Sequence, residues 1–148
     1  MIIETLTWGT LDINEEQVYH FSKGIPGFEE ETEFALIIGE EGPFSYLQSL
    51  NNQSLSFLLS DPFVFYPSYE FQLPESDKEE LELEDDVIVC CIVTIKDELE
   101  QATLNLLAPI VLNPVKRTGK QVVLHKSSYG TKHRLWNAME EVLQKGGE

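Results

Sequence analysis

The residues that could carry out chemistry are few and scattered along the chain. The three histidines, His20, His125 and His133, have none of the spacings with which proteins bind a metal ion. The sequence also contains no HExxH, no paired CxxC, no phosphate-binding loop and no GxSxG. We therefore expect no catalytic residue, no metal site and no cofactor, and we assign each histidine a structural or surface role.

The two cysteines are adjacent and lie within an apolar run. Cys90 and Cys91 fall in VIVCCIVTI, residues 87–95, which is apolar at successive positions and therefore predicts a central strand covered on both faces. Neighbours in a strand point to opposite faces, which excludes an ordinary disulfide between them. Burial in apolar surroundings raises the pKa of a thiol and hides it. Both cysteines are predicted to be inert core residues.

The carboxylates are abundant, but their pattern is not that of a catalytic pair. The 26 acidic residues against ten lysines and arginines give a net charge of −16. Residues 1–110 carry 23 acids and three lysines, a net charge of −20, whereas residues 111–148 have a net charge of +4. A body this negative repels nucleic acid and anionic membranes and attracts basic proteins. The alternative is that the charge serves solubility alone.

Two segments combine apolar or aromatic side chains with acids, as protein-binding patches do. SKGIPGFEE, residues 22–30, is a glycine-rich turn, from which we expect one apolar side chain to point inward and the other to face a partner. The second segment, residues 63–71, is rich in aromatics. For Phe28 a role as a hairpin plug stays open, and for Phe71 a place in the core. The predicted contact residues are Ile25, Pro26, Phe28, Glu29, Glu30, Tyr66, Tyr69, Glu70 and Phe71.

The elements that must position these residues are mostly short strands. About ten strands, separated by turns every eight to twelve residues or so, predict a mainly β, antiparallel barrel-like domain over residues 1–148. Residues 63–71 are expected at a sheet edge or in a bent strand, because Pro67 cannot donate to a ladder. Residues 75–86 predict a short acidic helix, capped by Ser76 or Asp77, with Leu81 and Leu83 turned inward.

The C-terminal part is predicted to contain two further elements. Residues 121–125 are expected to form a strand that pairs back across the basic loop NPVKRTGK, whose Lys116, Arg117 and Lys120 are predicted to be solvated. An apolar stripe at three- and four-residue steps predicts a helix over residues 131–145. The N-terminus lacks the pattern of a signal peptide, and no apolar run reaches membrane-spanning length. We expect a cytoplasmic protein.

Five segments, in this order, resemble the flagellar assembly factor FliW family over nearly the whole chain. They are FSKGIPGFEE (21–30), PFSYLQS (43–49), FLLSDPFVFYPSYEFQL (57–73), TLNLLAPIVLN (103–113) and GKQVVLH (119–125). The resemblance implies a small β-barrel-like cytoplasmic protein without catalytic activity. It also implies two alternative partners, the C-terminal region of flagellin and CsrA, a dimeric RNA-binding protein that represses translation of flagellin message. Once flagellin is secreted, the freed protein would bind CsrA and relieve this repression.

An acidic domain docked on a basic RNA-binding protein can weaken RNA binding without covering the RNA site. Carboxylates within about a Debye length, ~8 Å at physiological salt, impose a negative potential where RNA would approach. Two other interpretations stay open. One is an acidic nucleic-acid mimic that occupies the RNA groove itself, although the acids here are clustered and not spaced like phosphates. The other is a small-ligand barrel, which would need an apolar cavity with converging polar groups.

Overall fold

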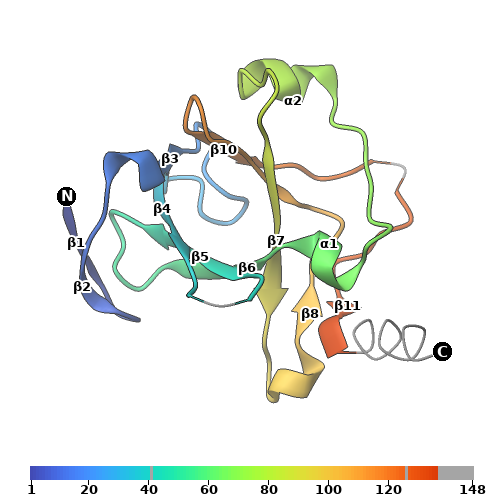
Figure 1. Cartoon of the computed structure of the whole chain (residues 1–148), viewed down its shortest axis with the longest axis horizontal. Coiled ribbons are helices and arrows are strands. Elements are labelled where there is room, and N and C mark those ends of the chain that lie inside the picture. Colours follow the sequence, from blue (N-terminus) through green and yellow to red (C-terminus); the bar gives the residue numbers. More distant parts are fainter. Residues whose placement is uncertain (41, 126, 137–148) are drawn as a thin grey trace.

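A computed structural model describes residues 1–40, 42–125 and 127–136, and its centre is a closed β-barrel (Figure 1). The barrel belongs to a nine-stranded sheet of the described residues and closes because β9 pairs with both β10 and β7. Its neighbouring strands are antiparallel except β3 and β10, which are parallel at Thr118 and His20. The barrel strands, in the order in which they pair, are β7 (Ile88–Thr94), β6 (Ser56–Ser60), β5 (Phe44–Ser49), β4 (Glu33–Ile38), β3 (Val18–His20), β10 (Thr118–Gln121) and β9 (Ile110–Asn113). The mainly β, barrel-like prediction is confirmed.

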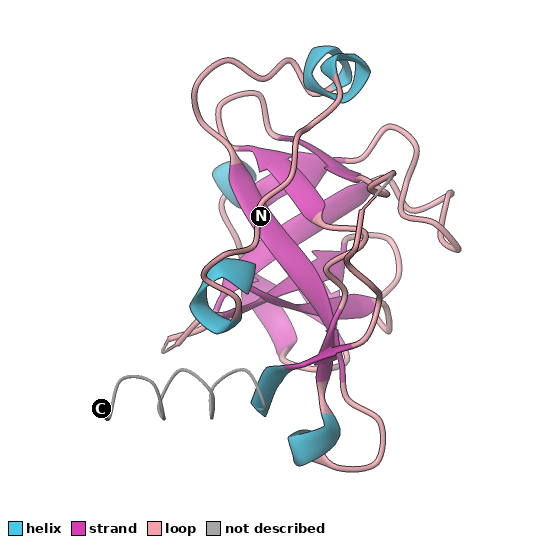
Figure 2. Cartoon of the chain, turned by 90° about the vertical axis from the view of Figure 1, so that its right-hand side faces the viewer, coloured by secondary structure: helices cyan, strands magenta, loops and turns pink. Residues whose placement is uncertain are grey.

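The remaining elements extend or surround the barrel. Figure 2 shows the strands crossing at the centre, with the helical turns around the outside. β8 (Thr103–Leu104) pairs with the C-terminal end of β7, and β11 (His133–Arg134) pairs with β8. The other elements are the hairpin β1 (Ile2–Thr5) and β2 (Gly9–Asp12), the 3-10 turns η1 (Glu15–Gln17) and η2 (Leu99–Gln101), and the helices α1 (Pro62–Phe65) and α2 (Glu75–Glu80).

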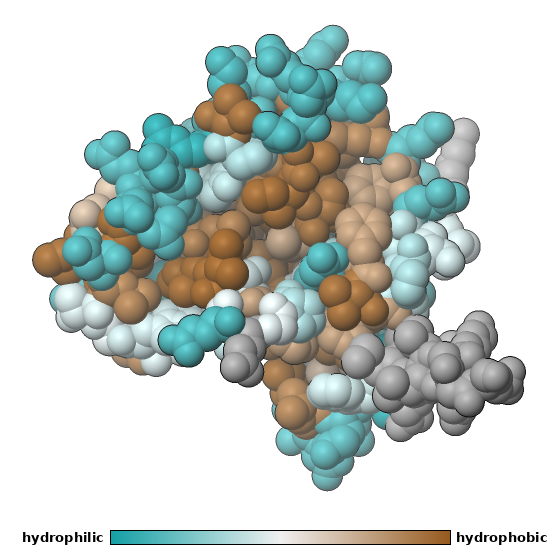
Figure 3. Space-filling view, viewed as in Figure 1, coloured by the Kyte–Doolittle hydropathy of each residue, from teal (hydrophilic) through white to brown (hydrophobic). Residues whose placement is uncertain are grey.

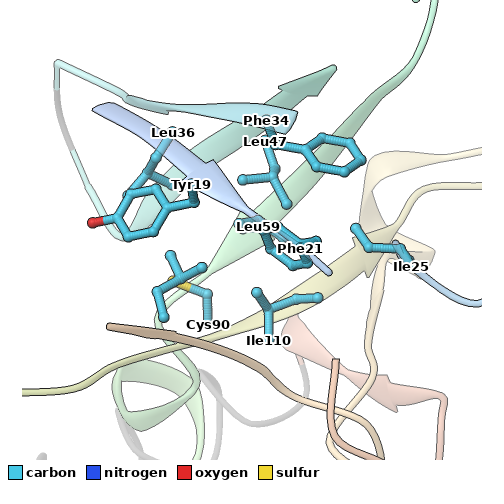
Figure 4. Close-up of a cluster of buried hydrophobic side chains, with 10 residues drawn as sticks. Tyr19, Phe21, Ile25, Phe34, Leu36, Leu47, Leu59, Cys90 and Ile110 are labelled. Carbon is cyan, nitrogen blue, oxygen red and sulfur yellow. The ribbon is translucent and has the colours of Figure 1, made fainter. Parts of the chain in front are cut away.

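The barrel interior is filled by its own apolar side chains, which Figure 4 shows converging from strands on all sides. Phe21 and Phe34 pack edge to face with their ring centroids 5.2 Å apart, and both are fully buried. Ile25 reaches into this cluster from the loop after β3. Burial of each side chain of this size contributes about 1.5–3 kcal/mol to folding. Because side chains occupy the interior, the barrel is a packed core.

β7 is covered on both faces, as its sequence predicts. Cys90 points into the barrel core, and Cys91 points outward into a second cluster with Phe65, Tyr69 and Leu104. Both thiols are free. Burial raises the pKa of Cys90 to about 11 and that of Cys91 to about 12. The prediction of two buried thiols of raised pKa is confirmed.

Two predictions for the chain between β6 and β7 are wrong. Residues 62–65 form helix α1 instead of a strand, because Pro62 occupies the first turn and the Asp61 carboxylate accepts a hydrogen bond from the Phe63 N–H at 2.9 Å. Residues 66–74 have no regular structure. Helix α2 begins at Glu75 as predicted but ends at Glu80 and not at residue 86, and its N-cap is Pro74, without a side-chain hydrogen bond. Neither Ser76 nor Asp77 caps the helix, because both lie within it, and the Asp77 carboxylate binds Lys120.

Further corrections concern the C-terminal part of the chain. The strand expected at 121–125 lies at Thr118–Gln121, because a tight turn with Arg117 at φ 57° brings Thr118 opposite Asn113. Lys120, expected to be solvated, is half-buried and ion-paired. In the helix predicted over 131–145, His133–Arg134 is strand β11 and helical geometry begins at Leu135. Residues 137–145 of that prediction lie outside the described residues.

Candidate protein-binding groove

The chain between β6 and β7 leaves the barrel and returns, and a groove of about 1040 Å³ lies beside it. One arm, residues 66–74, runs from α1 to α2, and the other, residues 81–87, runs from α2 back to β7 (Figure 1). Val89 and Val111, which are cross-strand partners in β7 and β9, form part of the groove floor. The groove is lined by Phe63, Tyr69, Glu70, Phe71, Gln72, Leu73, Pro74, Glu75, Lys78, Leu83, Glu84, Asp85, Asp86, Val87, Val89 and Val111.

The groove combines an apolar interior with an acidic rim. Figure 3 shows hydrophobic side chains gathered at the centre of this face, below the hydrophilic surface at α2. Val87 is 49% exposed although it is apolar. Acids lie on both arms, and the single base among the lining residues, Lys78, is 3.7 Å from the Glu75 carboxylate. An apolar floor with a charged rim is the usual anatomy of a protein-binding patch.

Three tyrosine hydroxyls hold the first arm in place. The Tyr69 hydroxyl donates to the Leu106 carbonyl at 2.8 Å, and the Tyr66 hydroxyl donates to the Arg134 carbonyl at 2.6 Å. The Tyr129 hydroxyl accepts the Glu70 N–H at 3.1 Å. Burial raises the pKa of Tyr69 well above its ordinary value, so its hydroxyl remains a protonated donor. These bonds tie an irregular segment to a rigid framework.

Hydrogen bonds attach the start of the second arm to the β9–β10 hairpin. The Asn113 side-chain amide donates to the Leu81 and Glu82 carbonyls at 2.8 and 3.0 Å. The Thr118 hydroxyl donates to the same Leu81 carbonyl at 2.8 Å. Glu82 has a φ of 56°, which reverses the chain after α2, and Leu81 is 2% exposed. The turn that begins the second arm therefore has a defined position.

An ion-pair network joins α2 to the barrel and to the 22–30 loop. The Lys120 ammonium lies 2.6 Å from an Asp77 oxygen and also binds Glu80, which in turn lies 3.2 Å from the Lys23 ammonium. Partial burial opposes the charge on Lys120, but its hydrogen bonds to Asp77 and Glu80 raise its pKa. The hydrogen bond from Lys120 is the main cause that lowers the pKa of Glu80. The network fixes the helix that connects the two arms.

The 22–30 loop divides its two apolar residues as expected from the sequence. Ile25 is 1% exposed, whereas Phe28 is 42% exposed and packs edge to face on Phe57 with ring centroids 5.5 Å apart. Gly24 has a φ of +64°, and a Cβ there would lie 2.6 Å from the Phe28 carbonyl oxygen, so the tight turn requires glycine. The Gly27 N–H donates to the Glu29 carboxylate at 3.1 Å, which lowers the pKa of Glu29.

The predicted contact residues therefore fall into two separate places. Tyr69, Glu70 and Phe71 line the groove, and Tyr66 is half-buried beside it. Ile25 is a correction, because its side chain is buried in the barrel core and lies outside the groove. The Tyr69 side chain is also buried, at 3% exposed, but it lines the groove from below. None of the loop residues lines the groove. Of the predicted contact residues in the loop, those with exposed side chains are Pro26, Phe28, Glu29 and Glu30.

Sequence reasoning missed most of the second arm. Leu83 and Val87 line the groove, as do the acids at 84–86, which were predicted only as part of the acidic helix over 75–86. A signal was present, since the acidic run at 75–86 directly follows the aromatic segment. What sequence reasoning lacked was the path of the chain that makes these two segments face one another.

Groups for other chemistry are sparse in the described part of the chain. No set of three or more histidine, cysteine or acidic side chains there is placed to hold a metal ion. The ring of His133 is partly buried, which lowers its pKa, and its Nε2 accepts the Gly130 N–H at 2.8 Å. The Asn105 side-chain oxygen accepts the Ala108 N–H at 3.0 Å, so this amide serves the local backbone. Among the described helices, none is long and apolar enough to cross a bilayer.

Comparison with known proteins places this architecture in a family. The family model described as FliW protein matches residues 2–135. The chain belongs to the FliW family. The flagellar assembly factor FliW of Bacillus pumilus is 48% identical over 138 residues, which cover 91% of this chain and 96% of that protein. The FliW of Bacillus subtilis is 46% identical over 136 residues, covering 90% and 95%.

A solved FliW structure has the same fold. The crystal structure of a flagellar assembly factor FliW superimposes with a TM-score of 0.85 at 42% sequence identity, covering 91% of this chain and 96% of that one. The agreement spans nearly the whole of both chains.

Proposed function

We propose that this FliW-family protein is a cytoplasmic, non-enzymatic binding protein with two alternative partners. It binds the C-terminal region of flagellin, and once freed by flagellin export it binds and antagonises CsrA. The observation that carries the proposal is an apolar groove with acids on both sides, in a chain of net charge −16 whose relatives are named flagellar assembly factors. This surface suits a basic protein partner and no direct contact with nucleic acid.

The charge distribution supports antagonism without steric blocking. Glu84, Asp85 and Asp86 are exposed at the rim of the groove, so a partner bound there has carboxylates close to its own surface. Within about a Debye length, ~8 Å, such charges oppose the approach of phosphate. A coupling free energy of about 1–3 kcal/mol corresponds to roughly 5- to 150-fold in RNA affinity.

Co-purification with CsrA and with flagellin, each at low and high salt, tests the proposal. We expect capture of both proteins, with CsrA binding more sensitive to salt because it is basic. Failure to bind either protein in dilute buffer would refute the proposal. An RNA competition assay then separates mechanisms, since a nucleic-acid mimic excludes RNA, whereas an allosteric antagonist passes through a ternary complex and accelerates RNA release.

The small-ligand interpretation finds less support. The barrel interior holds ten buried side chains of one core cluster, and the large groove lies outside the barrel on the outer face of β7 and β9. Thermal-shift screening against small metabolites would identify a ligand that binds in the groove.

A further inference from the structure

The groove is an apolar surface that the described residues leave open. Val87, Val89 and Leu73 present aliphatic side chains there, and Phe63 is 44% exposed at one end. Exposed apolar side chains gathered in a hollow and rimmed by charge mark an interaction site. Val89 and Val111 belong to adjacent paired strands, so this part of the floor is rigid.

The acids around the groove differ in how their charges are compensated. Asp77 and Glu80, on α2, are neutralised by Lys120, and Glu75 lies beside Lys78. By contrast, no ion pair joins Glu70, Glu84, Asp85 or Asp86 to another residue in the described ranges. These uncompensated carboxylates are distributed over both arms of the groove. The negative charge available to a ligand therefore lies on two sides of an apolar floor.

The first arm and the turn that begins the second arm are held in place before any ligand binds. Tyrosine hydroxyls fix the first arm, and Asn113 and Thr118 fix the turn that begins the second. A site whose backbone is held in this way loses little conformational entropy on binding. The groove is therefore suited to an incoming segment that brings its own apolar residues and charges.

We propose that the groove binds one amphipathic segment of a basic protein, with apolar residues on the floor and lysines or arginines against both arms. This proposal names the kind of segment that the proposed function would bind. It depends on the proposed function only in assuming that the ligand is a protein. The charge complementarity of the uncompensated rim carboxylates selects this occupant. A second copy of this chain, with its net charge of −16, would be repelled.

A fluorescent peptide serves as the probe. It carries leucines at i, i+3, i+4 and i+7, with lysines at the remaining positions. One control peptide has the same composition in scrambled order, and another has glutamate in place of lysine. We expect the full-length protein to bind the first peptide at least about fivefold more tightly than the scrambled one, since each well-placed apolar anchor contributes on the order of 1 kcal/mol. Equal affinity for both lysine peptides would overturn the proposal.

Two groove variants and a matched control locate the binding. Val87→Gln removes an apolar anchor without changing charge, and the double variant Asp85→Asn, Asp86→Asn removes two rim charges. The control Glu15→Gln, Glu16→Gln makes the same change in net charge at exposed positions of η1, away from the groove. We expect roughly 5- to 10-fold weaker peptide binding for each groove variant and less than about twofold for the control. Equal losses in groove and control variants would mean attraction by overall charge and would overturn the proposal.

Binding of CsrA and flagellin to the same variants separates the two proposals. If the wild-type protein binds either partner and every variant binds it equally well, the groove assignment fails and the proposed function stands. If the wild-type protein binds neither partner, the proposed function fails, and the peptide titration still decides the chemistry of the groove. Sedimentation of the free protein tests a second copy as occupant, since self-association abolished by Val87→Gln would overturn the proposal.

Discussion

The 22–30 loop and the excursion between β6 and β7 share a type of composition but have different structures. Both place apolar or aromatic residues next to acids. In the loop, a turn at Gly24 directs Ile25 into the barrel core and leaves Phe28 on Phe57. In the excursion, Tyr69 is buried in the outer cluster, and two arms separate to leave a hollow with a charged rim. The tight turn leaves a half-exposed aromatic side chain on the surface, whereas the long excursion forms a groove.

This difference shows that composition does not decide which residues are available to a partner. The buried member of each segment holds the exposed members in place, and its partners lie far away in the chain. Ile25 packs with residues from several barrel strands, and the Tyr69 hydroxyl binds Leu106. Four predictions test how far each region depends on its buried anchor.

The largest effect is expected from Ile25→Ala, which removes the anchor of the loop. Truncation of a fully buried isoleucine costs about 2–5 kcal/mol of unfolding free energy, because a cavity remains in the core. Phe28→Ala is the matched control and should cost about 1 kcal/mol, since its ring is half-exposed and loses one aromatic contact. Urea unfolding measures both. Similar losses would mean that the two side chains are equally embedded, contrary to the structure.

Tyr69→Phe tests the anchor of the excursion. The change leaves the Leu106 carbonyl without its donor in a buried setting, which should lower the unfolding free energy by about 1–3 kcal/mol. The comparison variant is Tyr46→Phe, because the Tyr46 hydroxyl makes no hydrogen bond to another residue of the described ranges. In thermal or urea unfolding, Tyr69→Phe should lose clearly more unfolding free energy than Tyr46→Phe. If Tyr46→Phe is as harmful as Tyr69→Phe, the hydrogen bond to Leu106 is not what holds the arm.

Lys120→Met tests the link between the two regions through α2. The side chains of Lys120 and Asp77 are 24% and 12% exposed, and we expect a loss of about 1–2 kcal/mol at pH 7. Because the folded-state pKa of Glu80 lies below its ordinary value of 4.5, this part of the stability is complete above pH 4.5 and is lost as pH falls through the folded value. Unfolding curves of wild type and variant should therefore converge in acid.

The control for that experiment is Lys116→Met, on the same hairpin and exposed. It should change stability by less than about 0.5 kcal/mol at either pH. A gap between wild type and Lys120→Met that persists unchanged to low pH would show that lost packing, and not the ion pairs, accounts for the effect.

The smallest effect on stability is expected from the double variant Glu29→Lys, Glu30→Lys. Both side chains are exposed, so the unfolding free energy should shift by about 0.5 kcal/mol or less. The variant is informative when its binding to CsrA is measured at two salt concentrations. If the loop contacts CsrA, affinity should fall and its dependence on salt should weaken. Unchanged affinity and an unchanged salt slope would remove the loop from the interface and leave the groove as the candidate surface.

The strands were predictable because local patterns determine them. The two-sided apolar run at 87–95 predicts a central strand almost where β7 lies. Errors arose where a distant residue prevails over a local preference. Asp77 was expected to cap a helix and instead binds Lys120, which is far along the chain. The 63–71 segment is a different case, because a local signal decided it: Asp61 and Pro62 begin a helix where a sheet edge or bent strand was expected.

The candidate site was predictable only in part. Glu70 and Phe71 were named because they lie side by side in a segment rich in aromatics, and both line the groove. Val87 was not named, because at the start of an apolar strand it resembles any other core residue. Its 49% exposure results from the position of the second arm, which Asn113 holds from another strand pair.

The sequence alone determines four things: the acidity of residues 1–110, the burial of the two cysteines, the barrel class, and the expectation that one of Ile25 and Phe28 is buried. These depend on charge count, on the period of two in a strand and on backbone preferences within a few residues. Only the tertiary structure places Glu70 and the acidic residues 84–86 on two sides of one apolar floor. The reason is physical, since that arrangement depends on the pairing of β7 with β9 and on hydrogen bonds between segments that no local pattern connects.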